Sequence, residues 1–222
     1  MSSGVFKKAL SYATGAFTLA FALFYFSDLD LIISDAAFKI TSFKSCSILS
    51  TLSLIGKLSG VLYASYLLRN IFLDRPEKSY LKREAFFLIS VLITGPGIIN
   101  NFILKPAFDR PRPHEIHRYN DSNNQQFVKV LVISSTQGKD SFPSGHAGSG
   151  FFFIAPWFIG RIRQKYGWKI FLPAFLWGGA VSVFRILEGQ HFFSDCLGSL
   201  CVVYFTALFL SQVMGLFKST EG

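Results

Sequence analysis

Long apolar stretches separated by shorter polar segments recur along the chain. About 17 to 25 apolar residues are enough for a helix to cross the hydrocarbon core of a bilayer. The pattern predicts an all-α integral membrane bundle of about six transmembrane helices, approximately at Leu10–Phe26, Ile48–Phe72, Ala85–Leu104, Gly148–Ile162, Ile170–Leu187 and Asp195–Phe217. The fourth stretch is the shortest, so its bounds are the least defined. We expect one membrane domain over residues 1–222, with its motif-bearing core at about 85–217.

Positively charged residues gather in the connections of one side. Loops that stay in the cytoplasm are enriched in Lys and Arg. If both termini are cytoplasmic, the inner side holds 12 of the 22 Lys and Arg residues, namely Lys7, Lys8, Arg69, Arg75, Lys78, Lys82, Arg83, Arg161, Arg163, Lys165, Lys169 and Lys218. The first outer loop then holds only Lys39 and Lys44. The pattern therefore predicts that both termini lie inside.

Seven further positive residues are placed outside by the same topology. They are Lys105, Arg110, Arg112, Arg118, Lys129, Lys139 and Arg185. An outward cluster runs against the topological bias, so it indicates an anionic ligand. Lys57 lies within the second apolar stretch, where it can snorkel to the outer interface or face the bundle interior, and we favour an interpretation without a catalytic role.

The composition argues against a nucleic-acid partner. Of the 222 residues 50% are hydrophobic and only 16% are charged, and the chain exceeds a soluble domain mainly in its 26 phenylalanines. The net charge is +9, but no polar segment carries a basic stripe with interleaved aromatic residues. The bilayer is the expected partner, and the pattern carries no signal of an oligomeric state.

A first polar motif, Lys105-x6-Arg112-Pro113, follows the third apolar stretch. Pro106, Pro111 and Pro113 are expected to end the helix after Leu104, because proline lacks the amide donor and clashes with the preceding turn. Lys105 and Arg112 would then lie on irregular backbone and could converge on phosphate oxygens. Contacts to lipid headgroups explain this motif equally well when it is taken alone.

A second motif, Pro143-Ser144-Gly145-His146, precedes the fourth apolar stretch. This is a helix-start signal, and free backbone amides at a helix N-terminus can bind an anion that Gly145 allows to approach closely. The Ser144 hydroxyl can add a donor. His146 would lie beside a bound phosphate, where an imidazolium can protonate a leaving alkoxide.

A third motif, Arg185-x5-His191-x3-Asp195, joins the fifth and sixth stretches. His191 and Asp195 are four residues apart, so they share a face if a helix begins at His191. The carboxylate could then hold one imidazole nitrogen as a donor and leave the other as a nucleophile. Arg185 would complete an oxyanion cage. An Arg–Asp pair that only stabilises two helices is the weaker interpretation.

The three motifs, in this order, resemble the type-2 phosphatidic acid phosphatase superfamily. The resemblance implies that His191 attacks phosphorus, that His146 protonates the leaving group and later acts as a base toward water, and that Asp195 supports His191. It implies no metal and no other cofactor. The implied phosphate-binding residues are Lys105, Arg112, Ser144, Gly145 and Arg185. Many members have a serine where this chain has Phe184, so a hydroxyl donor is missing or replaced.

The polar segment from His114 to Phe142 is long for a connection, and such loops often bind ligands or act as lids. Residues in or near it could contact a substrate headgroup, namely Arg110, His114, His117 and Arg118. A solvated loop is the simpler interpretation of these side chains.

The resemblance implies a phosphorylated membrane lipid as substrate. It suggests a multi-pass protein of the bacterial inner membrane with a periplasmic active site, and lipid A, dephosphorylated at position 1 or 4', is the leading candidate. Undecaprenyl pyrophosphate, phosphatidylglycerol phosphate and phosphatidic acid stay open, as does a phosphotransferase of the same chemistry. An anion-binding transporter or scaffold, or a metal hydrolase that uses the four histidines, is less favoured.

Overall fold

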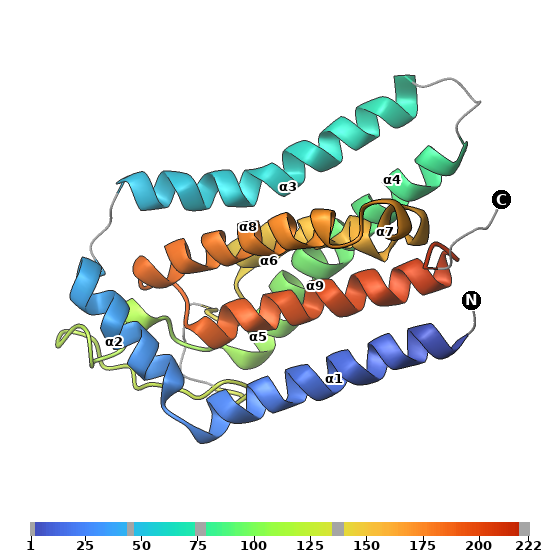
Figure 1. Cartoon of the computed structure of the whole chain (residues 1–222). Helices are drawn as coiled ribbons and strands as arrows, with labels where there is room; N and C mark the ends of the chain where they lie inside the picture. The colour runs from blue at the N-terminus through green and yellow to red at the C-terminus, as the bar shows by residue number, and fades with distance from the viewer. Residues whose placement is uncertain (1–2, 44–46, 74–78, 135–139, 218–222) are drawn as a thin grey trace.

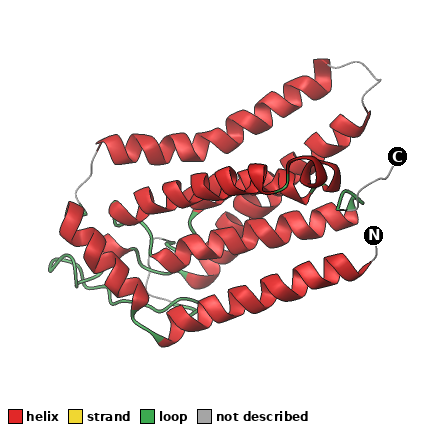
Figure 2. Ribbon diagram, viewed as in Figure 1, coloured by secondary structure: helices red, strands yellow, loops and turns green. Residues whose placement is uncertain are grey.

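The computed structural model describes residues 3–43, 47–73, 79–134 and 140–217. These residues are mainly helical and contain no β-strand, only an isolated bridge between Ile116 and Gln125 (Figure 2). The helices are α1 (Ser3–Phe26), α2 (Leu29–Thr41), α3 (Ser47–Leu73), α4 (Ser79–Leu92), a π-helix (Ile93–Leu104), α5 (Lys105–Phe108), a 3-10 turn (Pro113–Glu115), α6 (Gly145–Phe151), a 3-10 segment (Phe152–Phe158), α7 (Gly160–Tyr166), α8 (Trp168–Leu187) and α9 (Phe193–Val213). The predicted all-α fold is confirmed.

Five helical segments are long and apolar enough to cross a membrane, at Gly4–Phe26, Ser47–Arg69, Leu81–Glu115, Trp168–Leu187 and Phe193–Val213. By length and composition they correspond to five of the six expected spans. The remaining stretch is divided into α6, the 3-10 segment and α7, which all pack against α8. Pro156 lies in the 3-10 segment, and Ile159 is extended before α7 begins. Because proline lacks an amide donor, it breaks the α-helical hydrogen bonding of this stretch.

The expected break after Leu104 is wrong. The π-helix contains Pro96 and continues directly into α5, so Lys105 lies on helical backbone and not on a loop. Pro106 lies at one of the first two positions of α5, and neither Pro96 nor Pro106 interrupts the helical backbone of this segment. The helix ends instead at Asp109, whose φ is 41°. Arg112 lies in extended backbone, as expected.

Helix α2 occupies the segment that we expected to be a simple outer loop. Figure 1 shows it at one end of the bundle, between the end of α1 and the beginning of α3. Three of its residues, Asp30, Ser34 and Ala37, are buried. The helix also reaches the rest of the protein through Thr41, whose hydroxyl donates to the carbonyl of Leu187 at 2.6 Å.

Glycines allow α6 and α8 to pack closely. A Cβ atom on Gly150 would lie 3.1 Å from the Cα atom of Gly178, and one on Gly178 would lie 2.2 Å from the ring of Phe151. Small residues at such crossings let helix backbones approach in membrane proteins. The close contact fixes α6 at the centre of the bundle.

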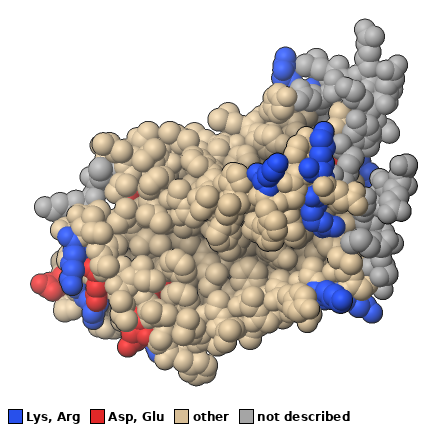
Figure 3. Space-filling view, in the orientation of Figure 1, with Lys and Arg blue, Asp and Glu red and all other residues tan. Residues whose placement is uncertain are grey.

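The three motifs lie toward the end of the bundle that holds α2 and the start of α9 (Figure 1). Helix α1 begins and α9 ends at the opposite end. On the face shown in Figure 3, charged side chains gather near the two ends and leave an uncharged band between them, as a bilayer requires. Lys44, Arg75, Lys78, Lys139 and Lys218, which entered the topology prediction, lie outside the described residues, as does the side chain of Arg161.

Candidate active site

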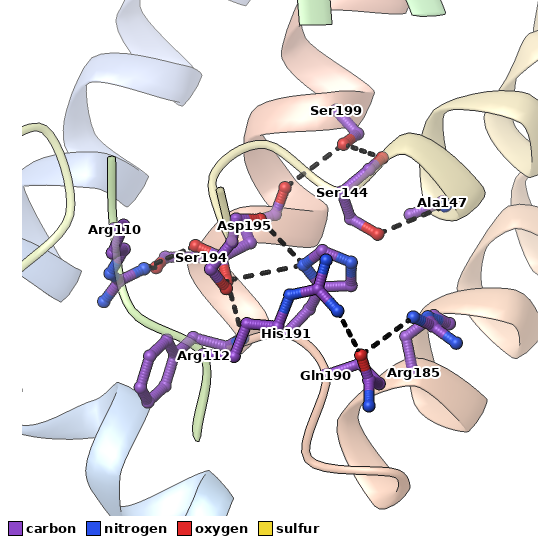
Figure 4. Close-up of polar contacts among 12 residues, drawn as sticks. Arg110, Arg112, Ser144, Ala147, Arg185, Gln190, His191, Ser194, Asp195 and Ser199 are labelled. Atoms are coloured by element: carbon purple, nitrogen blue, oxygen red, sulfur yellow. Dashed lines mark hydrogen bonds and ion pairs between the residues drawn. The ribbon is translucent and has the colours of Figure 1, made fainter. Parts of the chain in front are cut away.

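Arg112 and Arg185 lie on either side of the side chain of Gln190. The Gln190 Oε1 atom accepts a hydrogen bond from Arg112 Nη1 at 2.5 Å and one from Arg185 Nη2 at 3.4 Å (Figure 4). One oxygen thus holds two guanidinium groups that come from the first and the third motif. A phosphate oxygen could take its place, because guanidinium groups bind phosphate oxygens with the same geometry.

A second set of contacts holds Arg185 in place. It is buried, and its Nη1 donates to Glu188 Oε2 at 2.7 Å and lies 3.4 Å from Ser53 Oγ of α3. Glu188 in turn accepts from Ser50 at 2.8 Å. The Nε atom of Arg185 has no acceptor among the described residues. An unpaired buried donor is unfavourable, so this N–H group is suited to a bound anion.

Lys105 and Lys57 add positive charge to the same site. Lys105, at the start of α5, is half-buried and interacts electrostatically with Arg112, Arg185 and Lys57. Lys57 of α3 is exposed, and its charge also acts on His146. A lysine within an apolar helix thus contributes to the electrostatic potential at His146.

The second motif forms the start of α6, as predicted. Ser144 is the N-cap and its hydroxyl accepts from the Ala147 amide at 3.4 Å. Its amide donates to the Asp195 carbonyl at 3.1 Å, which ties α6 to α9. Gly145 and His146 are the first two residues of the helix, so their amides have no acceptor within it.

His191 is held by a backbone carbonyl. Its Nδ1 lies 2.7 Å from the carbonyl oxygen of Ser141, and because that oxygen can only accept, Nδ1 carries the proton. Asp195 Oδ2 is 3.8 Å from the same nitrogen, beyond hydrogen-bonding distance. Helix α9 begins at Phe193, so the condition that a helix begins at His191 is not met. The Nε2 atom therefore keeps its lone pair. The acceptor for the Nδ1 proton is the Ser141 carbonyl, whereas the sequence had suggested the Asp195 carboxylate.

Burial favours the neutral form of both histidines. Burial lowers the pKa of His191 to about 4, and the Asp195 carboxylate offsets only part of this effect. Burial, followed by the charge of Arg185 and weaker effects of other cationic groups, lowers the pKa of His146 to about 3. A neutral His191 is ready to act as a nucleophile. His146 can act as an acid only when a bound anion offsets the surrounding positive charge.

Asp195 is fully buried and has several partners. Its Oδ2 accepts from the Ser141 hydroxyl at 2.6 Å and from the Phe192 amide at 2.7 Å, and its Oδ1 accepts from Arg110 at 2.5 Å. Arg110 is only 1% exposed. Its expected role as a headgroup contact is therefore wrong, because the guanidinium is enclosed by its protein partners.

The other proposed headgroup residues lie around the outer end. His114 is half-buried and donates from Nδ1 to the Gly189 carbonyl at 2.8 Å, which places it next to the third motif. His117 is exposed. Arg118 is exposed and forms a two-point ion pair with Asp35 of α2, at 2.8 and 2.6 Å. Of these three, His114 is the one whose hydrogen bond reaches the segment before His191.

Sequence reasoning missed four residues of this site, namely Asp30, Ser141, Glu188 and Gln190. Glu188 and Gln190 stand between Arg185 and His191, which was a usable signal. Ser141 acts on Asp195 through its hydroxyl and on His191 through its main-chain carbonyl, and Asp30 is distant in sequence. Neither role had a signal in the sequence. Within the described part of the chain, no group of three or more His, Cys, Asp or Glu residues could hold a metal ion.

The PAP2 superfamily profile matches residues 84–218, which contain all three motifs. A relative from Francisella tularensis subsp. novicida (strain U112), named lipid A 4'-phosphatase, is 31% identical over 159 residues, which cover 70% of this chain and 68% of the relative. No solved structure gives a significant match.

Proposed function

The chain belongs to the PAP2 superfamily, as its motifs indicated, and we propose that it is a membrane lipid phosphatase that works through a phosphohistidine on His191. The hydrogen bond from His191 Nδ1 to the Ser141 carbonyl carries this proposal. It leaves Nε2 as the nucleophile in a site that also contains two guanidinium groups, Arg112 and Arg185. Lys105 and the first amides of α6 supply further positive charge to a phosphate.

The reaction has two balanced steps. His191 Nε2 attacks phosphorus, the bond from phosphorus to the lipid oxygen breaks, and the leaving oxygen takes the proton of His146. Water then attacks the phosphohistidine and gives a proton to His146, and the P–N bond breaks to release inorganic phosphate. The cationic groups stabilise the charge of both transition states without a metal ion in this proposal.

We propose that the active site faces the periplasm in a bacterial inner membrane. The positive connections at the opposite end of the bundle support this orientation, because cytoplasmic loops are enriched in Lys and Arg. A single cysteine at exposed Ser122 should react with a membrane-impermeant reagent added outside intact spheroplasts. A cysteine at exposed Lys165 on α7 is the matched control and should react only after lysis. The reverse labelling would contradict the orientation.

The substrate proposed is lipid A, at its 4'-phosphate. The relative named lipid A 4'-phosphatase supports this choice. Purified protein in detergent should release phosphate from lipid A, and mass spectrometry of the product should show loss of the 4' group. Undecaprenyl pyrophosphate, phosphatidylglycerol phosphate and phosphatidic acid belong in the same panel, with and without a chelator. Faster release from one of these three would replace lipid A as substrate, and loss of activity with the chelator would contradict metal independence.

A further inference from the structure

A buried ionic cluster lies next to the catalytic pair and is distinct from the phosphate-binding residues. It consists of Asp30, Arg110, Ser194 and Asp195, which we call the Asp30 cluster. Arg110 donates from Nη2 to Asp30 Oδ2 at 2.8 Å, and from Nη1 to Asp195 Oδ1 at 2.5 Å and to Ser194 Oγ at 2.8 Å. In Figure 4, Arg110 and Arg185 lie on opposite sides of His191.

Each member of the cluster depends on the others. All four residues are at most 1% exposed. Removal of a buried charged partner leaves the opposite charge uncompensated in a medium of low dielectric constant. Asp30 also accepts from the amide of Ser194 at 3.0 Å and from its hydroxyl, which fixes the first turn of α9. The ring of Phe192 lies 4.3 Å from the Arg110 guanidinium carbon and closes one face of the cluster.

The cluster is connected to the nucleophile through Asp195 and Ser141. Because Arg110 occupies Oδ1 of Asp195, the other oxygen is directed to the Ser141 hydroxyl, at 2.6 Å. The carbonyl of Ser141 then accepts the Nδ1 proton of His191, at 2.7 Å. A change in the orientation of Arg110 would therefore alter the group that fixes the tautomer and ring angle of His191.

Asp30 belongs to α2, outside the matched segment 84–218. We propose that Asp30 and Arg110 are positioning residues for His191, so that the catalytic unit of this chain extends into α2. This inference rests on the proposed phosphohistidine chemistry. Neither residue contacts the phosphate, and their effect is on the step that His191 performs.

Asp30→Asn and Asp35→Asn form a matched pair of variants. Both carboxylates belong to α2 and pair with an arginine that follows α5, but Arg118, the partner of Asp35, is exposed and is not bonded to the catalytic pair. With lipid A as substrate, we expect Asp30→Asn to lower kcat by about 10- to 100-fold with little change in KM, because misplacement of a reacting group has effects of this size. Asp35→Asn should keep kcat within about twofold of the wild type.

A spectroscopic measurement tests the positioning of His191 independently of enzyme activity. The chain has four histidines, so ¹⁵N-histidine spectra can be assigned with a His191→Ala reference. His191 should be a single Nδ1–H tautomer in the wild type and in Asp35→Asn, and a mixture in Asp30→Asn. A wild-type protein that releases no phosphate but shows this difference would refute the proposed function alone. An unchanged tautomer in folded Asp30→Asn, with wild-type kcat, would overturn the positioning role.

The variant Arg110→Lys distinguishes a positioning role of the Asp30 cluster from a purely structural one. Lysine keeps the positive charge but loses the planar fork that reaches two carboxylates. We expect a folded, slow enzyme, and we expect Asp30→Asn to add no further loss of kcat to it, since both act through one contact. Independent losses that multiply would contradict the proposal. Failure of both single variants to fold would show that the cluster is only structural, and would equally contradict it.

Discussion

His191 donates its Nδ1 proton to the carbonyl of Ser141 at 2.7 Å, while the carboxylate of Asp195 lies 3.8 Å from the same nitrogen. The backbone therefore fixes the tautomer of His191, and Asp195 contributes its charge and its hydrogen bond to Ser141. This differs from a protease triad, where the carboxylate itself receives the imidazole proton.

Asp195→Asn should be milder in this protein than in such a triad. Loss of the carboxylate in a triad lowers kcat by about 10⁴-fold, because the imidazole adopts the wrong tautomer. Here the Ser141 carbonyl is retained, so we expect a loss of about 10²-fold, from weaker stabilisation of positive charge on His191. Steady-state kinetics on folded variant protein is the measurement. A loss near 10⁴-fold would mean that Asp195 bonds His191 directly during turnover.

Replacement of His146 should affect poor leaving groups most. His146→Gln removes the proton donor, and general acid catalysis is worth about 10²- to 10⁴-fold for an alkoxide. A p-nitrophenyl phosphate ester needs little protonation, so its release should be slowed much less. Comparable losses with the lipid and with the nitrophenyl ester would contradict the role of His146 as acid.

The pH dependence should reflect both histidines. His191 must be neutral to attack, so the acid limb of kcat/KM should fall near its pKa of about 4. His146 must be protonated, and the charge of a bound phosphate should raise its pKa above about 3, so kcat should fall on the basic side. Lys57→Gln removes a positive charge that lowers this pKa, and should move the basic limb to higher pH.

Lys129→Gln is the matched control for that shift, since Lys129 is not among the charges that act most on His146. Its pH profile should match the wild type. A basic limb that moves down in Lys57→Gln, or that does not move, would contradict the placement of Lys57 beside the site.

Gln190 should tune phosphate affinity. Its amide oxygen lies between Arg112 and Arg185, where a phosphate oxygen is expected. Gln190→Glu places a carboxylate there that competes for both guanidinium groups, so KM should rise by about tenfold. Gln190→Ala frees the arginines and should leave KM close to the wild type or lower. The opposite order of the two KM values would exclude phosphate binding between these arginines.

The sequence predicted the helices better than the contacts between them. Five of the helices could be predicted from the length of their apolar stretches alone, because a helix must present about 20 apolar residues to cross a bilayer. Helix α2 was missed since Asp30, Asp35 and Lys39 interrupt its apolar pattern. The residues of all three motifs lie near one another in the structure. The role of Arg110 was misinterpreted because its partner Asp30 precedes it by 80 residues. The main-chain acceptor at Ser141 has no side-chain signature.

Identification of the phosphorylated residue tests the central claim most directly. Wild-type protein is mixed with lipid substrate for a few milliseconds, quenched in alkali, which preserves phosphohistidine, and analysed by mass spectrometry of its peptides. We predict phosphate on His191, in an amount that rises in a variant such as His146→Gln when a nitrophenyl ester is the substrate, because the water step is then slowed. Phosphate on His146, or rapid turnover with no phosphoenzyme under these conditions, would contradict the mechanism.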